Sequence, residues 1–240
     1  MTETLSGKVA LVTGASRGIG YAIAKALASH GAHIIAIART QEGLESLDDE
    51  IQALGGTATL TPLDLREFDR IDALGGIVAE KWGRLDILVG NAAILGTLGP
   101  VGHIEPEEWG HLLDINLSAN WRLIRAFDSL LRASDHGRAL FLTSSVASQR
   151  LKPYWGGYAA AKAGLEAMIR TYALEVAKTP MRVNILDPGA TRTAMRAQAM
   201  PGEDTNALPH PDEIAATAVD MLLPAWMDNG DMIIHKDYVA

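Results

Sequence analysis

The sequence predicts an α/β protein with one doubly wound parallel sheet of about seven strands and helices on both faces of that sheet. Short apolar runs alternate with longer helical patterns along the chain, as they do in successive β–α–β units. The runs are apolar throughout instead of alternating with polar residues, which indicates strands buried on both faces. No repeat or Pro/Gly-rich linker interrupts this pattern, so we expect residues 1–240 to form a single domain.

The order of the expected elements follows from these runs. Strands are expected at residues 9–12, 34–37, 57–61, 85–89, 139–143, 183–186 and 232–234. Helices are expected at about 18–29, 42–54 and 67–82, and two long helices are expected to begin near residues 107 and 158. The segment 193–211 is less regular, and we interpret it as a substrate flap within the same domain.

Composition narrows the classes of partner. The formal net charge is −8, which disfavours nucleic acid because an acidic surface repels phosphate backbones. The chain has no cysteine, and its seven histidines lack the spacing of a zinc site, so no metal is expected. The apolar runs are too short to cross a bilayer, and no secretory signal is visible at the start. We therefore expect a cytoplasmic protein without a membrane or nucleic-acid partner.

A glycine-rich segment, residues 13–20, directly follows the first expected strand and opens the first helix. Its glycines, Gly14, Gly18 and Gly20, suit backbone angles that a Cβ forbids and the close approach of a pyrophosphate. The helix N-terminus adds free N–H groups and a partial positive charge for the anion. An ordinary glycine-rich turn is the alternative, but the position in the first β–α–β unit favours a Rossmann-type dinucleotide site.

The end of the second expected strand indicates which dinucleotide binds. A carboxylate at this position binds the ribose 2′-hydroxyl of NAD, whereas a nearby arginine suits the 2′-phosphate of NADP. Here Ala38 is followed by Arg39, and Arg17 lies in the glycine-rich segment. Two guanidinium groups and no carboxylate favour NADP(H) over NAD(H), with two solvated surface charges as the alternative.

Tyr158 and Lys162 are four residues apart at the start of a long alanine-rich helix, so they lie on one helical face. A nearby ammonium stabilises a phenolate and should lower the pKa of the tyrosine toward the range useful for general acid–base catalysis. An exposed pair on an amphipathic helix is the alternative. Ser144 and Ser145 follow the fifth expected strand, at the edge where sheets of this type bind ligands.

These motifs resemble those of the short-chain dehydrogenase/reductase family, and the resemblance extends along nearly the whole chain. The glycine spacing matches, and Asn116, Ser145, Tyr158 and Lys162 match the family's catalytic tetrad in order. The resemblance implies that Tyr158 is the general acid–base and that Ser145, thirteen positions earlier, binds the substrate oxygen, with Ser144 as the weaker candidate. It also implies that Asn116 helps to hold a water that links the lysine to solvent, with a local side-chain bond to the backbone as the alternative.

The same resemblance assigns cofactor-binding residues along the chain. They are Gly14, Ser16, Arg17, Gly18, Ile19, Gly20, Arg39, Asp64, Leu65, Asn91, Ala92, Tyr158, Lys162, Pro188, Gly189, Thr191 and Thr193. Asp64 is expected to contact adenine or to cap a turn. Asn91 matches the second position of the family's Asn-Asn-Ala-Gly motif, although Gly90 and Ala93 replace its first and last residues. Asp187, which precedes the Pro-Gly turn, is unusual and is expected either to cap the end of the sheet or to alter the electrostatics near the nicotinamide.

The resemblance implies an NADP(H)-dependent oxidoreductase that transfers a hydride between the nicotinamide and a small carbonyl or secondary alcohol substrate. We expect the substrate beside Ser145 and Tyr158, with Leu95 and Trp155 in the pocket wall; a packing or interface aromatic is the alternative for Trp155. The wall is expected to be completed by Ile94, Tyr154 and Met195. A 3-oxoacyl-thioester reductase is a narrower version, and a protein that senses NADP(H) without turnover is the alternative.

Two further expectations rest on the family resemblance. A homodimer or homotetramer is implied, with the two long helices that begin near Glu107 and Tyr158 forming the main interface. The C-terminal residues 232–240 depart from the Gly-Gly ending that is common in the family. The usual pocket and tetramer contacts of that tail are therefore not carried over to this chain.

Overall fold

The computed structural model of the protein describes residues 5–146 and 150–239. Seven parallel strands form one sheet in the order β3-β2-β1-β4-β5-β6-β7, which is the expected doubly wound fold. The strands are β1 (Val9–Thr13), β2 (His33–Ala38), β3 (Thr57–Pro62), β4 (Ile87–Gly90), β5 (Arg138–Leu142), β6 (Arg182–Asp187) and β7 (Met232–Ile234). Their ends differ from the expected ones by at most two residues. β1, β4 and β5 are buried along their whole length, which defines these apolar runs clearly, whereas β3 and β7 at the edges of the sheet are only partly buried.

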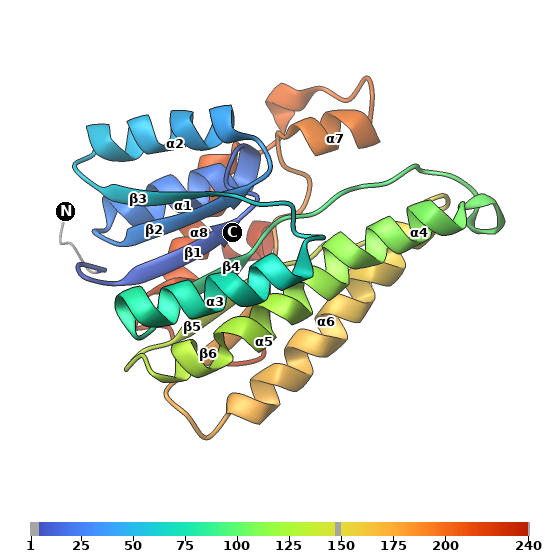
Figure 1. The fold of residues 1–240 in the computed structure, drawn as a ribbon. Helices are drawn as coiled ribbons and strands as arrows, with labels where there is room; N and C mark the ends of the chain where they lie inside the picture. Colours follow the sequence, from blue (N-terminus) through green and yellow to red (C-terminus); the bar gives the residue numbers. More distant parts are fainter. Residues whose placement is uncertain (1–4, 147–149, 240) are drawn as a thin grey trace.

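Helices cover both faces of the sheet (Figure 1). One layer contains α1 (Gly18–Ser29), α2 (Gln41–Ala53) and α8 (Pro211–Leu222). The other contains α3 (Phe68–Trp82), α5 (Ala119–Arg132) and α6 (Gly156–Val176), and α4 (Pro106–Leu113) continues the line of α5. Each layer buries an apolar stripe at helical spacing, such as Leu123, Phe127 and Leu131 of α5, against one face of the strands. The core therefore has two halves, one on each face of the sheet.

The strand order reverses beside β1. The chain moves outward from β1 through β2 to β3, and then returns to place β4 on the other side of β1. Such a reversal opens a crevice at the carboxyl ends of the two central strands, where doubly wound folds bind their ligands. These carboxyl ends point to the right in Figure 1, and the glycine-rich segment lies directly beyond β1.

Three segments near this edge have structure that the sequence patterns do not reveal. The expected flap, 193–211, contains two short helices, α7 (Ala194–Ala199) and η3 (Thr205–Ala207), and lies at the top right of Figure 1. A π-helical turn, η2 (Asp114–Ser118), joins α4 to α5 without a break. The atypical C-terminal residues follow β7 as a short helix, α9 (His235–Tyr238). A further 3-10 turn, η1 (Val101–His103), precedes α4.

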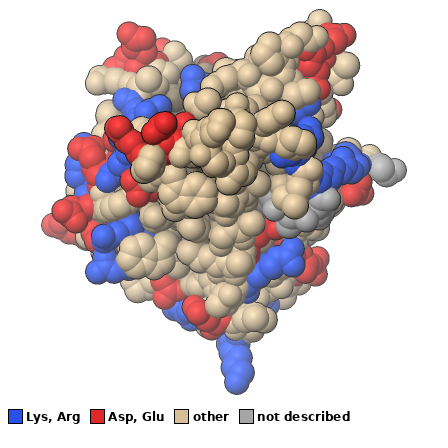
Figure 2. Space-filling view, turned by 90° about the vertical axis from the view of Figure 1, so that its right-hand side faces the viewer, with Lys and Arg blue, Asp and Glu red and all other residues tan. Residues whose placement is uncertain are grey.

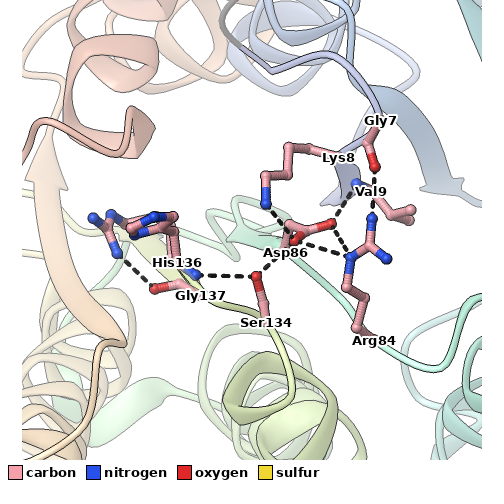
Figure 3. Close-up of polar contacts among 9 residues, drawn as sticks. Gly7, Lys8, Val9, Arg84, Asp86, Ser134, His136 and Gly137 are labelled. Carbon is pink, nitrogen blue, oxygen red and sulfur yellow. Dashed lines mark hydrogen bonds and ion pairs between the residues drawn. The ribbon is translucent and has the colours of Figure 1, made fainter.

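The opposite, amino-terminal edge of the sheet is held by a buried carboxylate (Figure 3). Asp86 is 1% exposed and accepts hydrogen bonds from the Val9 N–H at 2.9 Å and the Ser134 hydroxyl at 2.6 Å. The Lys8 ammonium and the Arg84 guanidinium each lie 3.2 Å from it. The carboxylate thus joins β1, β4 and the segment before β5, and it lies at the far end of the strands from the functional edge.

Candidate active site

A cavity of about 510 Å³ opens at the carboxyl edge of the sheet. Residues that follow β5, β6 and β7 line it, together with the start of α6 and the segment 193–211. Figure 2 views the molecule from this side, where uncharged surface fills the middle of the face and side chains of both charges lie around it. Because parallel sheets bind ligands at the carboxyl ends of their strands, this cavity is the candidate active site.

Some of the residues that were expected around a substrate line the cavity, and others do not. The cavity wall contains Leu95, Ser145, Trp155, Tyr158 and Met195. The Trp155 ring packs edge-on against the Tyr158 ring with their centroids 5.9 Å apart, so Trp155 both lines the cavity and packs. Ile94 and Tyr154 lie outside the wall. The Tyr154 side chain is exposed, and its φ of 72° is left-handed, which turns the chain just before α6 begins.

Tyr158 and Lys162 lie in the first turns of α6 and are both buried. Burial raises the pKa of Tyr158 to about 12, with a further contribution from the negative charge of Asp187, whereas a hydrogen bond from Ser144 acts in the opposite direction. Burial lowers the pKa of Lys162 to about 8, and the charge of Glu166 opposes that change. The Lys162 Nζ donates to the Leu142 carbonyl at 2.8 Å. The expected lowering of the tyrosine pKa is therefore wrong, because burial raises this pKa and the Lys162 ammonium donates instead to the end of β5.

The residues just beyond β5 contact two different groups. The Thr143 hydroxyl donates to the Glu166 Oε1 at 2.6 Å. Ser144 hydrogen-bonds to the Tyr158 phenol, and this bond lowers the pKa of the phenol. The Ser145 hydroxyl and amide face the Asp187 carboxyl group and lower its pKa, but burial raises that pKa and has the larger effect. The structure thus brings both serines into the cavity that Tyr158 lines, and Ser144 is the one that hydrogen-bonds to the phenol.

Asn116 is fully buried in the π-helical turn η2. Its Oδ1 accepts from the Ile94 N–H at 2.8 Å and its Nδ2 donates to the Ile94 carbonyl at 2.9 Å. The side chain therefore clamps the segment that follows β4, and the Asn116 carbonyl accepts from Asn120 at 3.0 Å. Both bonds span 22 residues of sequence, so the alternative of a local side-chain bond is wrong for this side chain. π-helical turns such as η2 occur frequently at functional sites.

The glycine-rich segment forms a cradle whose shape requires glycine. Gly14 and Gly18 have φ of 67° and 60°, in the left-handed region that residues with a Cβ rarely adopt. A Cβ on Gly20 would collide with the Asn91 amide and the Gly14 carbonyl. Asn91 also donates to the Thr13 carbonyl at 2.8 Å, so β4 and the cradle are bonded together. No side chain caps the start of α1, which leaves its N–H groups for an anion.

The far end of the crevice carries arginines. Arg17 and Arg39 are exposed beside the cradle and the end of β2. Asp64 is held by hydrogen bonds from the side chain and amide of Arg66, and these bonds, together with the nearby charge of Arg39, lower its pKa to about 2 against the effect of its burial. Asp64 therefore caps a turn, which was the alternative to a contact with adenine. Leu65 lies in the core beside it.

The Pro-Gly turn after β6 completes the crevice. The Asp187 Oδ1 accepts from the Gly189 N–H at 2.9 Å, so the expectation that this residue caps the turn is confirmed. Its negative charge also contributes to the raised pKa of Tyr158. The Thr193 hydroxyl accepts from the Arg196 N–H at 3.2 Å and caps α7. Several expected cofactor-binding residues line the same cavity as the substrate residues, namely Ile19, Pro188, Gly189, Thr191 and Thr193.

Sequence reasoning missed several residues of this site. Ile234, His235 and Lys236 of the atypical tail line the cavity, and only the tail's position after the last strand could have suggested them. Glu166 is buried on the same face of α6 as Tyr158 and Lys162, and its spacing of four residues from the lysine was a usable signal. Arg66 holds the Asp64 carboxylate, and its position two residues after that acidic residue was a usable signal.

Three further observations on the described residues concern metals, membranes and the cofactor. Within 5–146 and 150–239 no group of three or more His, Asp or Glu side chains is placed to hold a metal ion. None of the helices in that part of the chain is long and apolar enough to span a membrane. The glycine cradle, the uncapped helix start and the exposed arginines instead fit a phosphate-bearing dinucleotide such as NADP(H).

Comparison with known proteins agrees with this geometry. The family model described as short chain dehydrogenase matches residues 8–204. The uncharacterized oxidoreductase YciK of Escherichia coli (strain K12) is 36% identical over 232 residues, which are 95% of this chain and 89% of that protein. The 3-oxoacyl-[acyl-carrier-protein] reductase FabG of the same strain is 38% identical over 189 residues, 79% of this chain and 75% of that protein.

A solved structure extends the likeness to the whole fold. The crystal structure of a short chain dehydrogenase from Shigella flexneri 2a, complexed with NADP, superimposes with a TM-score of 0.93 at 33% identity and covers 98% of this chain and 100% of that one. The family model covers most of the chain, and the likeness of fold extends over nearly all of it. This protein is therefore an oxidoreductase that belongs to the short-chain dehydrogenase/reductase family.

Proposed function

We propose that this protein transfers a hydride between NADP(H) and a small carbonyl compound or secondary alcohol, with Tyr158 as the general acid–base. The observation that carries the proposal is the placement of Tyr158, Ser144 and Ser145 in one cavity with the Pro-Gly turn. The bound nicotinamide supplies the hydride or accepts it. The residues of this chain then have to bind the substrate oxygen and move one proton at it.

In the reducing direction the Tyr158 hydroxyl donates its proton to the carbonyl oxygen. The buried phenol holds that proton at neutral pH, as its raised pKa requires. Lys162 is buried four residues further along the same helix, and we assign to its ammonium the stabilisation of the phenolate that is left behind. Ser144 and Ser145 provide hydroxyl donors to the substrate oxygen, where negative charge develops.

NADP(H) is proposed in preference to NAD(H). Arg17 and Arg39 are exposed at the end of the crevice, and Ala38 leaves that end of β2 without a carboxylate for a ribose 2′-hydroxyl. Guanidinium groups pair well with phosphate. That the Shigella relative was crystallised with NADP supports the same choice.

The cavity wall indicates only the general chemical character of the substrate. Leu95, Trp155 and Met195 give it apolar sides, whereas Arg150 and Lys152 are exposed at its rim. The likeness to FabG supports a 3-oxoacyl thioester as a narrower candidate, and that activity is one outcome of a substrate screen. A protein that binds NADP(H) without turnover remains the contrasting candidate.

A panel of ketones, 3-oxoacyl thioesters and alcohols, assayed with NADPH or NADP⁺, tests the proposal. We expect turnover of at least one carbonyl compound, and we expect Tyr158→Phe to abolish it while NADPH binding, followed by cofactor fluorescence, is retained. Tight NADPH binding without turnover of any compound would instead establish the sensor. Full activity of the Tyr158→Phe protein would exclude the assigned acid–base role.

A further inference from the structure

The lining of the cavity has the opposite charge balance to the rest of the protein. In the whole chain, acidic residues outnumber basic ones by 29 to 21. Among the described residues that line the cavity, Asp187 is the only acidic one, and it is buried. Four residues of the lining are cationic, namely Arg150, Lys152, Arg196 and Lys236. A cavity lined by one sign of charge attracts ligands of the other sign, so an anionic group is the kind of ligand that this lining favours.

We propose that the substrate carries an anionic group, a carboxylate or a phosphate, in addition to the carbonyl or hydroxyl that reacts, and that Lys152 and Lys236 bind this group. The inference rests on the proposed oxidation and reduction of carbonyl compounds and alcohols in this cavity, and it names the substrate class for that reaction. A small oxo acid or a phosphorylated ketone has the required chemistry, and so has the matching hydroxy compound.

Lys152 lies close to the reacting centre. It belongs to the segment before α6, in which the Arg150 N–H donates to the Ser145 carbonyl at 2.7 Å. The Lys152 Nζ lies 5.6 Å from the centroid of the Trp155 ring, and the same ring packs edge-on against Tyr158 with the centroids 5.9 Å apart. The ammonium and the phenol thus flank one aromatic ring. This separation suits a short substrate whose anionic group is a few atoms from its carbonyl.

The two lysines are available to a ligand, whereas Arg196 is not. The Arg196 Nε and a terminal nitrogen donate to the Glu203 carboxylate at 2.6 and 2.5 Å. Arg196, and to a smaller extent the charge of Lys152, lowers the pKa of Glu203, but no ion pair joins Lys152 to a described carboxylate. The Lys236 Nζ lies 3.7 Å from the Asp237 Oδ1, and both side chains are more than half exposed, so this pair is weak.

Lys236 is held at the cavity by the atypical C-terminal helix α9. The preceding residue, His235, is buried and hydrogen-bonded to Thr217 of α8 at 2.9 Å. The Tyr238 hydroxyl donates to the Asp220 Oδ2 of the same helix at 3.1 Å. These two bonds to α8 fix the position of the short helix, and with it the lysine at the rim. The tail that departs from the common Gly-Gly ending of the family therefore supplies a cation of this chain's own.

The cofactor does not account for the two lysines. Its phosphates are expected at the glycine cradle beyond β1 and at Arg17 and Arg39, and neither arginine belongs to the lining of the cavity. The strand order places β1 and β4 between β2, which Arg39 follows, and β5, which Lys152 follows. Lys236 follows β7 at the far edge of the sheet. The lysines are thus separated from the phosphate-binding end of the crevice, and they face the substrate end.

Matched pairs of compounds test the proposal. Oxo acids of increasing chain length are compared with their methyl esters, and phosphorylated ketones with the same ketones without phosphate, all with NADPH. We expect kcat/KM to be at least about fivefold higher for the anionic member of at least one pair, which corresponds to about 1 kcal/mol from exposed ion pairs. The difference should lie in KM and should shrink at high salt. The two series show whether a carboxylate or a phosphate is preferred.

Three variants connect the preference to the residues. Lys152→Gln and Lys236→Gln each remove one charge, so each should lower the preference for the anionic member, and the double variant should abolish it. Lys178→Gln is the matched control, because Lys178 is an exposed lysine beyond the end of α6 and outside the lining of the cavity. It should keep the preference. A general disturbance of the Trp155 ring would affect both members of a pair alike, so the ratio between them reports the charge.

The outcomes separate this inference from the proposed function. Turnover of neutral ketones without a preference for the anion in any pair overturns the inference and leaves the proposed reaction standing. If no compound is turned over, calorimetric titration of the same pairs into the NADP⁺-loaded protein decides the point, because binding needs no chemistry. Equal affinities in every pair, no binding of any anion, or a preference that survives in the double variant then overturns the inference.

Discussion

Removal of the charge of Asp86 should weaken the fold without touching the cavity. Asp86→Asn keeps the shape of the side chain but loses a charged acceptor for two buried donors, the Val9 N–H and the Ser134 hydroxyl. Hydrogen bonds to charged groups contribute about 1.5–3 kcal/mol each. The exposed parts of Lys8 and Arg84 add little because water screens them. We expect a loss of about 3 kcal/mol in the free energy of unfolding, within the range of about 3–5 for breaking a buried pair.

The same contacts predict how the effect depends on pH. Burial alone would raise the pKa of Asp86, but the bonds from Ser134 and Val9 and the charges of Lys8 and Arg84 leave it below its ordinary value. A lowered pKa in the folded protein stabilises it above the unfolded value of about 3.9, and that contribution is lost as the pH falls through the folded pKa. The difference in the free energy of unfolding between wild type and Asp86→Asn should therefore be constant from about pH 5 upward and should shrink below about pH 4.

Urea unfolding followed by circular dichroism at several pH values measures this difference directly. Glu67→Gln is the control, because the Arg70–Glu67 pair has side chains that are 56% and 47% exposed and should change stability by less than about 1 kcal/mol. Equal urea midpoints for wild type and Asp86→Asn at neutral pH would refute the reasoning. So would a difference that persists unchanged in acid, because the charge would then not be its source.

Three further predictions concern the cofactor and the assembly. Arg39→Ala should weaken NADPH far more than NADH in a fluorescence titration, and equal losses would count against the 2′-phosphate assignment. Gly20→Ala should abolish NADPH binding by forcing the Asn91 amide and the Gly14 carbonyl apart, whereas Gly76→Ala, with open space at its Cβ position, should bind normally. We also propose a homo-oligomer formed through α5 and α6, where Trp121 and Leu174 are 48% and 78% exposed. Light scattering should then give a lower molar mass for the Leu174→Asp protein than for wild type. A wild-type protein that is monomeric at micromolar concentration would contradict the proposed oligomer.

The sequence predicted the elements well wherever local physics defines them. The runs 9–12 and 34–37 are apolar throughout because both of their faces are covered, and β1 and β2 occupy these positions with one or two extra residues. Gly14 and Gly18 could be assigned to left-handed backbone because no other residue adopts it cheaply. The site motifs were visible for the same reason, since their spacing fixes which residues share a helix face or a strand end.

Other features depend on contacts between distant segments and could not be predicted. The spacing placed Lys162 beside Tyr158, but the pKa of the phenol depends on burial and on Asp187 of another strand, so its direction was missed. The same holds for the clamp that Asn116 makes on Ile94 and for the tail residues that line the cavity.

The sequence by itself determined the sheet and the glycine cradle, because periodicity and glycine act within a few residues, and the tetrad stays a prediction from the family resemblance. Only the tertiary structure decided the charge state of the site. It buried two carboxylates, Glu166 and Asp187, around one ammonium, and the energy of a charge in the interior depends on every group that surrounds it.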